Sequence, residues 1–158
     1  MADAPAALAA TLRGLGAAMA GVPDGWWVIG SAAVALHGGA VGAVHDVDLL
    51  VDEGIVAAVM ARLGVGPVAL PPDPRFRSRV FARCMRWPLT VEVMAGFAVA
   101  SGGGWQPVAP RWRVRITVGG EALWVPGRAE LLAMLQTFDR PKDRQRAAAL
   151  GQTGREPG

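Results

Sequence analysis

Residues 30–52 read GSAAVALHGGAVGAVHDVDLLVD and combine a glycine-serine pair, a short apolar helical stretch and two aspartates at the start of an apolar run. The run Val47–Val51 is typical of a buried strand. Alternate residues of a strand point to the same face, so Asp46 and Asp48 converge. Like charges this close repel each other unless a cation lies between them. The stretch therefore predicts a strand that carries a divalent metal site.

A third carboxylate, Glu92, lies between Val91 and Val93 in the apolar stretch LTVEVMAG. If this stretch forms the strand next to Val47–Val51, Glu92 reaches the face that carries the two aspartates. Three carboxylates offer the hard oxygen ligands that Mg²⁺ or Mn²⁺ prefers. Taken singly, Asp46 could cap its strand and Glu92 could lie on an exposed sheet face. The joint pattern favours the metal site.

Gly30 and Ser31 stand where the apolar run Trp26–Ile29 ends and a helical stretch begins. Glycine lets a backbone approach a ligand closely, and a helix start offers unpaired N–H groups and the positive end of a dipole. This arrangement can bind phosphate. The simpler interpretation is that Ser31 is an ordinary N-cap.

The composition fits a single domain in a reducing compartment. The chain has 158 residues, enough for one core, and a single cysteine, Cys84, which excludes an internal disulfide and a cysteine-cluster zinc site. No apolar run is long enough to span a bilayer, so we expect a cytoplasmic protein without a membrane partner. Of the 16 basic residues, 15 are arginine and one, Lys142, is lysine. Codon bias can produce such a skew. The net charge of +3 is therefore weak support for a nucleic-acid partner.

The pattern along the chain predicts an α/β or α+β domain in which helices flank a mixed sheet. The N-terminal helix is expected at 4–20, and the domain at 1–150 with its core at about 26–150. Residues 151–158 are expected to form a flexible tail. Further helices are expected at 31–38, 54–63, 128–138 and 142–150.

Two stretches alternate arginine with apolar or small residues. Residues 75–84 predict one strand with a basic face, and RWRVRITVGG at 111–120 repeats the pattern before a hairpin turn at Gly119-Gly120. Such faces suit a triphosphate or an RNA acceptor, with Trp105 and Trp112 nearby for stacking. A solvated sheet surface explains them equally well.

The order of strand, Gly-Ser, helix, Asp-Val-Asp strand and later Glu-bearing strand resembles the nucleotidyltransferase fold of the DNA polymerase β superfamily. Within it, the chain is similar to the minimal nucleotidyltransferases and the abortive-infection toxin-like group. The resemblance covers about residues 26–150, and RPKDRQRAAAL is similar to a helix start of that group. It implies a two-metal reaction in which a hydroxyl attacks the α-phosphorus of an NTP and pyrophosphate leaves.

The resemblance also implies roles for individual residues. The two aspartates would hold both ions, Glu92 would hold the catalytic ion and help to deprotonate the acceptor, and Gly30-Ser31 would cradle the β- and γ-phosphates. Lys142 is a candidate contact to phosphate or acceptor. The implied catalytic residues and metal ligands are thus Asp46, Asp48 and Glu92, and the implied nucleotide contacts are Gly30, Ser31 and Lys142.

Other functions stay open at this point. The acceptor could be RNA, protein or a small molecule. A catalytically silent protein of the same fold could instead sense nucleotides or pair with an antitoxin-like protein, because Leu135 or Gln136 stands where relatives carry a lysine. The Asp-Val-Asp motif also matches the metal clamp of nucleotide-sugar glycosyltransferases, which leaves Gly30-Ser31 unexplained. A Rossmann fold is disfavoured, because Gly38, Gly39 and Gly42 follow a helix rather than a strand.

Overall fold

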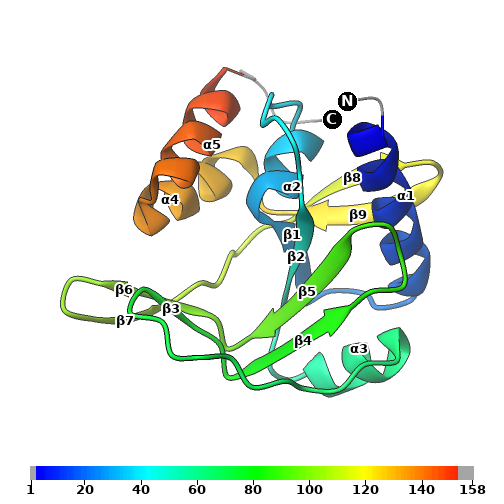
Figure 1. The fold of residues 1–158 in the computed structure, drawn as a ribbon, viewed down its shortest axis with the longest axis horizontal. Helices are drawn as coiled ribbons and strands as arrows, with labels where there is room; N and C mark the ends of the chain where they lie inside the picture. Colours follow the sequence, from blue (N-terminus) through cyan, green and yellow to red (C-terminus); the bar gives the residue numbers. More distant parts are fainter. Residues whose placement is uncertain (1–2, 153–158) are drawn as a thin grey trace.

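The computed structural model describes residues 3–152, which form one α+β domain of the predicted class (Figure 1). The helices are α1 (Asp3–Ala18), α2 (Gly30–Leu36), α3 (Val56–Leu63), α4 (Arg128–Phe138) and α5 (Pro141–Gly151). The strands are β1 (Trp26–Ile29), β2 (Asp46–Val51), β3 (Phe76–Arg77), β4 (Val80–Cys84), β5 (Thr90–Ala95), β6 (Ala98–Ser101), β7 (Gly104–Pro107), β8 (Val114–Val118) and β9 (Glu121–Val125). The predicted tail at 151–158 lies outside the described residues, apart from Gly151 and Gln152.

A four-stranded mixed sheet in the order β1-β2-β5-β4 forms the centre of the domain. Strand β1 pairs antiparallel with β2, β2 pairs parallel with β5, and β5 pairs antiparallel with β4. Helix α2 connects the edge strand β1 to its neighbour β2. The pairing of β2 with β5 places the strands that carry Asp46, Asp48 and Glu92 side by side, as the sequence analysis assumes.

Burial along β2 explains why this segment folds as a strand with two different faces. Val47 and Leu49 are fully buried, whereas Asp46 and Asp48 keep part of their surface exposed. The aliphatic side chains join a core that also contains residues of α1, α3 and α4. Each fully buried aliphatic side chain stabilises the fold by about 1.5–3 kcal/mol, so a register slip that exchanged the two faces would be very costly.

The hairpin of β8 and β9 turns at Gly119-Gly120, as the sequence predicts. Val118 pairs with Glu121, which leaves the two glycines as the turn. Their φ angles are 55° and 83°, and a type I′ turn needs positive φ at both positions.

Strand β8 is shorter than the pattern of RWRVRITV predicts, because it begins at Val114. The backbone N–H groups of Arg111 and Trp112 donate hydrogen bonds of 2.8 and 2.9 Å to the Glu130 carboxylate of α4. They are therefore used by a helix side chain and do not join a β ladder.

The single strand predicted over 75–84 is wrong, since two strands in different sheets occupy this stretch. Strand β3 pairs with β6, whereas β4 starts at Val80 and pairs with β5. The cause lies in the facing chain, which bends between β5 and β6 at Gly96 with a φ of 60°. The chain opposite bends at Arg79, whose N–H donates to the carbonyl oxygen of Ala95 at 2.9 Å. The arginines of this stretch consequently share no continuous face.

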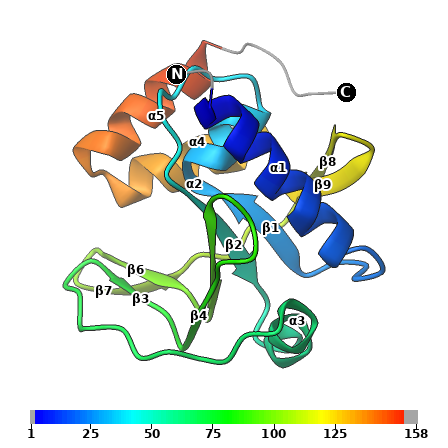
Figure 2. The same ribbon diagram turned by 45° about the vertical axis from the view of Figure 1, so that its right-hand side comes forward.

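An element that the sequence analysis does not predict is the hairpin of β6 and β7, which turns at Gly102-Gly103. With β3 it forms a three-stranded sheet in the order β3-β6-β7. Figures 1 and 2 show this sheet extending from the body on the same side as α4 and α5. Helix α3 lies at the far end of the molecule, beside β4.

The joint between α4 and α5 follows the predicted break at Pro141. Asp139 ends α4 in the left-handed region with a φ of 55°, and Pro141 occupies the first position of α5. Proline suits that position because its missing N–H would have had no partner there. Among the described helices, none combines the length and hydropathy needed to cross a bilayer.

Candidate active site

The parallel register of β2 and β5 brings the three predicted carboxylates together. Asp48 lies directly opposite Glu92, and Asp46 lies two residues earlier on the same face of β2. One oxygen from each carboxylate lies within 4.8 Å of the other two. All three side chains are partly buried. The cluster therefore concentrates three acidic groups at one point on the open face of the central sheet.

Gly30 is the residue that makes room for this cluster. It follows β1 directly, and β1 pairs with β2 so that Ile29 faces Asp48. Gly30 has a φ of 71°, and a Cβ atom there would lie 2.8 Å from Oδ2 of Asp48. Any larger residue would thus collide with the carboxylate as well as strain the backbone.

Ser31 follows Gly30 but is not among the residues that line the cleft with the carboxylates, and it is not the N-cap that the sequence suggests. Helix α2 already begins at Gly30, its N-cap residue is Ile29, and no side chain caps it. Ser31 is buried within the first turn, with 9% of its surface exposed. Because the left-handed Gly30 starts the helix directly after β1, the serine comes too late to act as the cap.

Asp48 has an unusual pKa for an aspartate. Removal from solvent is the main cause that raises its pKa to about 7, and the negative charges of Asp46 and Glu92 raise it further. Arg146 and Lys142 oppose this rise. A carboxyl held at such a pKa would gain much from a bound cation, because a cation favours its ionised form.

One protein cation already contacts the cluster. Nε of Arg83, on β4, lies 3.2 Å from Oε2 of Glu92, and the two residues are direct partners across the antiparallel pair. The guanidinium carbon of Arg83 also lies 5.0 Å from the centre of the Phe81 ring. The pair is partly exposed, with 41% of the arginine side chain and 23% of the glutamate side chain accessible.

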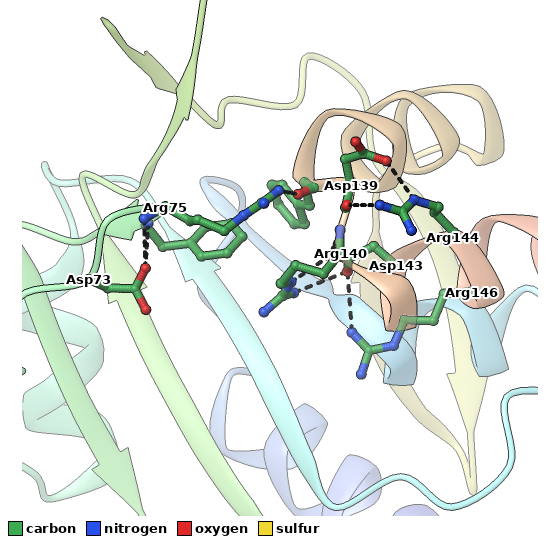
Figure 3. A network of polar contacts seen from close by, with 9 residues as sticks. Asp73, Arg75, Asp139, Arg140, Asp143, Arg144 and Arg146 are labelled. Atoms are coloured by element: carbon green, nitrogen blue, oxygen red, sulfur yellow. Dashed lines mark hydrogen bonds and ion pairs between the residues drawn. The ribbon is translucent and has the colours of Figure 1, made fainter. Parts of the chain in front are cut away.

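Helix α5 supplies the other positive charges near the aspartates. Lys142 and Arg146 stand four residues apart and hence on one side of the helix, and both line the same cleft as the carboxylates. Asp143 between them is completely buried. Its carboxylate accepts hydrogen bonds of 2.5 and 3.1 Å from Arg140 and lies 3.6 Å from Arg146 (Figure 3).

This buried aspartate fixes the start of α5. Oδ2 of Asp143 also accepts the backbone N–H of Arg140, which completes a capping box. Figure 3 shows Arg75, which lies just before β3, extending towards the end of α4, where it donates to the carbonyl oxygen of Phe138. These contacts join α4 and α5 to the segment that precedes β3.

The carboxylates lie in a cleft of about 670 Å³. One wall is α5, and the opposite wall is formed by the loop 68–73 together with β3. Phe76, Phe97 and Phe138 line the cleft and pack on one another, with ring centres 5.2 to 5.9 Å apart. Arg140 lies over the Phe76 ring at 4.6 Å. The cleft thus combines an acidic base, basic walls and an aromatic portion.

The donor set of this cluster fits a hard divalent cation. Mg²⁺ binds oxygen at about 2.1 Å, so oxygens on opposite sides of one ion lie roughly 4.2 Å apart. The span within the cluster, at most 4.8 Å, needs only small side-chain rotations to reach this value. The three carboxylates repel one another and one of them has a raised pKa, so a bound cation would be electrostatically favourable here.

Sequence reasoning did not find every residue of this site. Arg146 could have been found, because it stands one helical turn after Lys142 in the expected helix. The contact of Arg83 with Glu92 depends on the register of two antiparallel strands, and the sequence carries no signal for it. The three phenylalanines meet through tertiary packing between β3, the β5–β6 corner and α4.

The arrangement of strands and helices is that of the nucleotidyltransferase fold. Neither a protein-family model nor a curated protein matches the sequence. Solved structures do match the fold.

One of these structures, from Thermotoga maritima, is named a nucleotidyltransferase and is 21% identical to this chain. The match covers 90% of this chain and 91% of that chain, with a TM-score of 0.67. The antibiotic-resistance factor ANT(2″)-Ia, solved with adenylyl-2″-tobramycin, is 12% identical; 90% of this chain and 86% of that chain are covered, with a TM-score of 0.56. The lincosamide adenylyltransferase LnuA, solved with lincomycin, is 13% identical over 81% of this chain and 86% of its own, with a TM-score of 0.52. Identities this low establish a common fold alone.

Proposed function

We propose that this protein is a metal-dependent nucleotidyltransferase that transfers a nucleoside monophosphate from an NTP to a hydroxyl acceptor. The observation that carries the proposal is the cluster of Asp46, Asp48 and Glu92 on adjacent strands, facing cations of α5 across a cleft. The structural likeness to adenylyltransferases of antibiotics supports the same reaction class.

In this proposal the three carboxylates hold Mg²⁺ or Mn²⁺, which supplies positive charge for the triphosphate and lowers the pKa of the attacking hydroxyl. From α5, Lys142 and Arg146 contact the phosphates of the NTP. Gly30-Ser31 leaves space for these phosphates beside Asp48. Such fixed charges stabilise the negative charge that develops during phosphoryl transfer.

The reaction balances as follows. The acceptor oxygen forms a bond to the α-phosphorus, and the bond from that phosphorus to the oxygen bridging it to the β-phosphorus breaks. Pyrophosphate leaves with the electron pair of that bond. The proton of the acceptor hydroxyl is taken up by Glu92, which acts as the general base.

The first experiment is a thermal-shift titration with ATP, GTP, CTP and UTP, each with and without Mg²⁺ or Mn²⁺. A ligand that binds only the folded state raises the melting temperature. We expect an increase that needs both NTP and metal and is absent in Asp48→Asn. Asp24→Asn is the matched control, because Asp24 is exposed and lies outside the cleft. Shifts are compared within each variant, since Asp48→Asn itself alters stability.

The outcomes separate the proposal from its rivals. A metal-dependent shift that persists in Asp48→Asn would show that the site is elsewhere. Metal-dependent NTP binding without product in an acceptor panel of RNA, protein and small molecules would favour the catalytically silent alternative, for which an antitoxin-like protein partner is then sought. The cytoplasmic location stays a prediction.

A further inference from the structure

Arg77 and Arg79 have no role in the metal site, yet they line two separate hollows. The first is the cleft that holds the carboxylates, and the second is a hollow of about 340 Å³ that contains Trp105. Phe97 also lines both. We call Arg77, Arg79 and Phe97 the ridge, because they stand between the two hollows.

The position of Arg79 on the ridge depends on a glycine. A Cβ atom on Gly96 would lie 2.7 to 2.9 Å from Cγ, Cβ and Cδ of Arg79, so the arginine stem packs directly on the glycine backbone. The side chain still exposes 75% of its surface. Its stem is therefore held while its guanidinium group faces solvent, where it makes a 3.7 Å ion pair with the exposed Glu53.

Arg77 is positioned by an aromatic ring. Its guanidinium carbon lies 4.5 Å from the centre of the Trp105 ring, and Trp105 keeps 39% of its surface exposed. Trp105 lies on β7, in the sheet that extends from the body (Figure 1). An exposed indole beside an arginine is a typical platform for a stacked base.

The charges of the cleft favour an anionic ligand on this side. Apart from the metal cluster, the lining carboxylates are Asp73 and Asp143. Asp73 accepts the backbone N–H groups of Arg75 and Phe76, and Asp143 is paired with the arginines of α5. Once cations neutralise the cluster, the excess positive charge of the walls would repel a polycationic acceptor.

We propose that the acceptor is the end of a single-stranded nucleic acid. Its terminal hydroxyl reaches the carboxylate cluster, the adjoining phosphate crosses the ridge at Arg77 and Arg79, and the next base stacks on Trp105 in the second hollow. A paired base is already stacked within its duplex, so an unpaired end suits this surface better. The proposal rests on the proposed function, because it names the acceptor for the same reaction.

The test measures binding of a nucleic acid without NTP, so that no transfer can take place. The probe is a fluorescently labelled RNA of about eight nucleotides, a length within the usual site sizes for such proteins. Its anisotropy is followed during titration with the full chain in Mg²⁺, so that the carboxylate cluster is neutralised, and without NTP. The variants are Arg77→Gln/Arg79→Gln and Trp105→Ala. The matched controls are Arg115→Gln and Trp112→Ala, whose exposed side chains lie outside both hollows.

We expect saturable binding that weakens about tenfold in the double arginine variant. The slope of its salt dependence should fall by about 0.7, which corresponds to one phosphate on a single strand. Trp105→Ala should weaken binding by about fivefold or more. The two controls should stay within about twofold of the wild type. A labelled mononucleotide should bind much more weakly than the RNA, because it cannot reach both hollows.

Absence of saturable binding, or equal losses in the controls, would overturn the proposal. Equal affinity for the mononucleotide would mean that a small nucleotide is the acceptor, which contradicts the proposal. In a separate assay with ATP and Mg²⁺, adenylylation of tobramycin would mean that a cationic acceptor is used, which contradicts it as well. Because this assay contains no NTP and follows RNA alone, its failure is distinct from failure of the metal-dependent thermal shift with NTP, which tests the proposed function alone.

Discussion

Arg83 donates from Nε to Oε2 of Glu92 at 3.2 Å, across the antiparallel strands β4 and β5. The guanidinium group therefore occupies one oxygen of a carboxylate that we propose as a metal ligand. A bound ion must compete with this contact and is also repelled by the nearby positive charge.

We predict that Arg83→Gln binds Mn²⁺ more tightly than the wild type. A partly exposed ion pair contributes up to about 1 kcal/mol, so the gain should be about two- to fivefold in Kd. Isothermal titration or Mn²⁺ resonance measurements would show it, with Arg115→Gln as the control. Weaker metal binding by Arg83→Gln would mean that the arginine instead holds Glu92 in its binding position.

The raised pKa of Asp48 predicts how stability depends on pH. The folded protein holds this proton up to about pH 7, whereas the unfolded chain releases it near 3.8, the ordinary pKa of an aspartate. The folded state therefore binds more protons between these values, and the free energy of unfolding falls as the pH rises from about 4 to 7. Above pH 7 this contribution stays constant.

Asp48→Asn should accordingly stabilise the metal-free protein at pH 8, by roughly 1–3 kcal/mol, and leave it nearly unchanged at pH 4. Urea unfolding in EDTA at the two pH values measures this difference. Asp24→Asn serves again as the control. A stabilisation by Asp48→Asn that is equal at both pH values would show that ionisation of Asp48 is not its cause.

The same proton should compete with the metal. Binding of a divalent ion requires ionised Asp48, so the apparent Mn²⁺ affinity should fall by up to about tenfold per pH unit below pH 7 and level off above it. Titrations at several pH values between 5.5 and 8.5 would show the slope. A flat profile across this range would contradict a role for Asp48 as a metal ligand.

Strands β1, β2 and β5 and the carboxylates could be predicted from the sequence because both follow local periodicity. Val47 and Leu49 alternate with Asp46 and Asp48, and a strand with that pattern has one buried and one open face. Glu92 between two valines repeats the pattern. Only the pairing of β2 with β5 had to be assumed, and the register then places Glu92 opposite Asp48.

The features that could not be predicted depend on contacts between distant segments. Alternation alone suggests one strand at 75–84, but the bend at Gly96 in the facing chain divides it. Likewise, the Glu130 carboxylate captures two N–H groups that would otherwise extend β8. Local sequence patterns do not indicate such distant partners. The ridge, the second hollow and the contact of Arg83 with Glu92 can therefore be found only in the folded protein.

Gly30 provides a test of the space beside Asp48. Gly30→Ala should destabilise the protein by about 1–2 kcal/mol through its left-handed backbone and should also displace the carboxylate that lies 2.8 Å from the new Cβ. Gly38→Ala is the matched control, with a φ of 88° and no neighbouring atom within 4 Å of its Cβ. Both variants should lose stability, but only Gly30→Ala should lose Mn²⁺ affinity. A similar loss of Mn²⁺ affinity in both would assign the effect to general loosening of the fold.

The buried Asp143 should be essential for the position of α5. Asp143→Ala leaves Arg140 and Arg146 without their carboxylate and removes the capping box, so we expect a loss of about 3–5 kcal/mol in the free energy of unfolding. Asp139→Asn is the comparison, because its bond to Arg144 joins two side chains that are each 61% exposed and asparagine tolerates the left-handed backbone of this position, so it should cost clearly less than Asp143→Ala. Urea unfolding at pH 7 measures both. Equal losses would mean that burial of Asp143 adds nothing to its ion pairs, and that Lys142 and Arg146 are held over the cleft by helix packing alone.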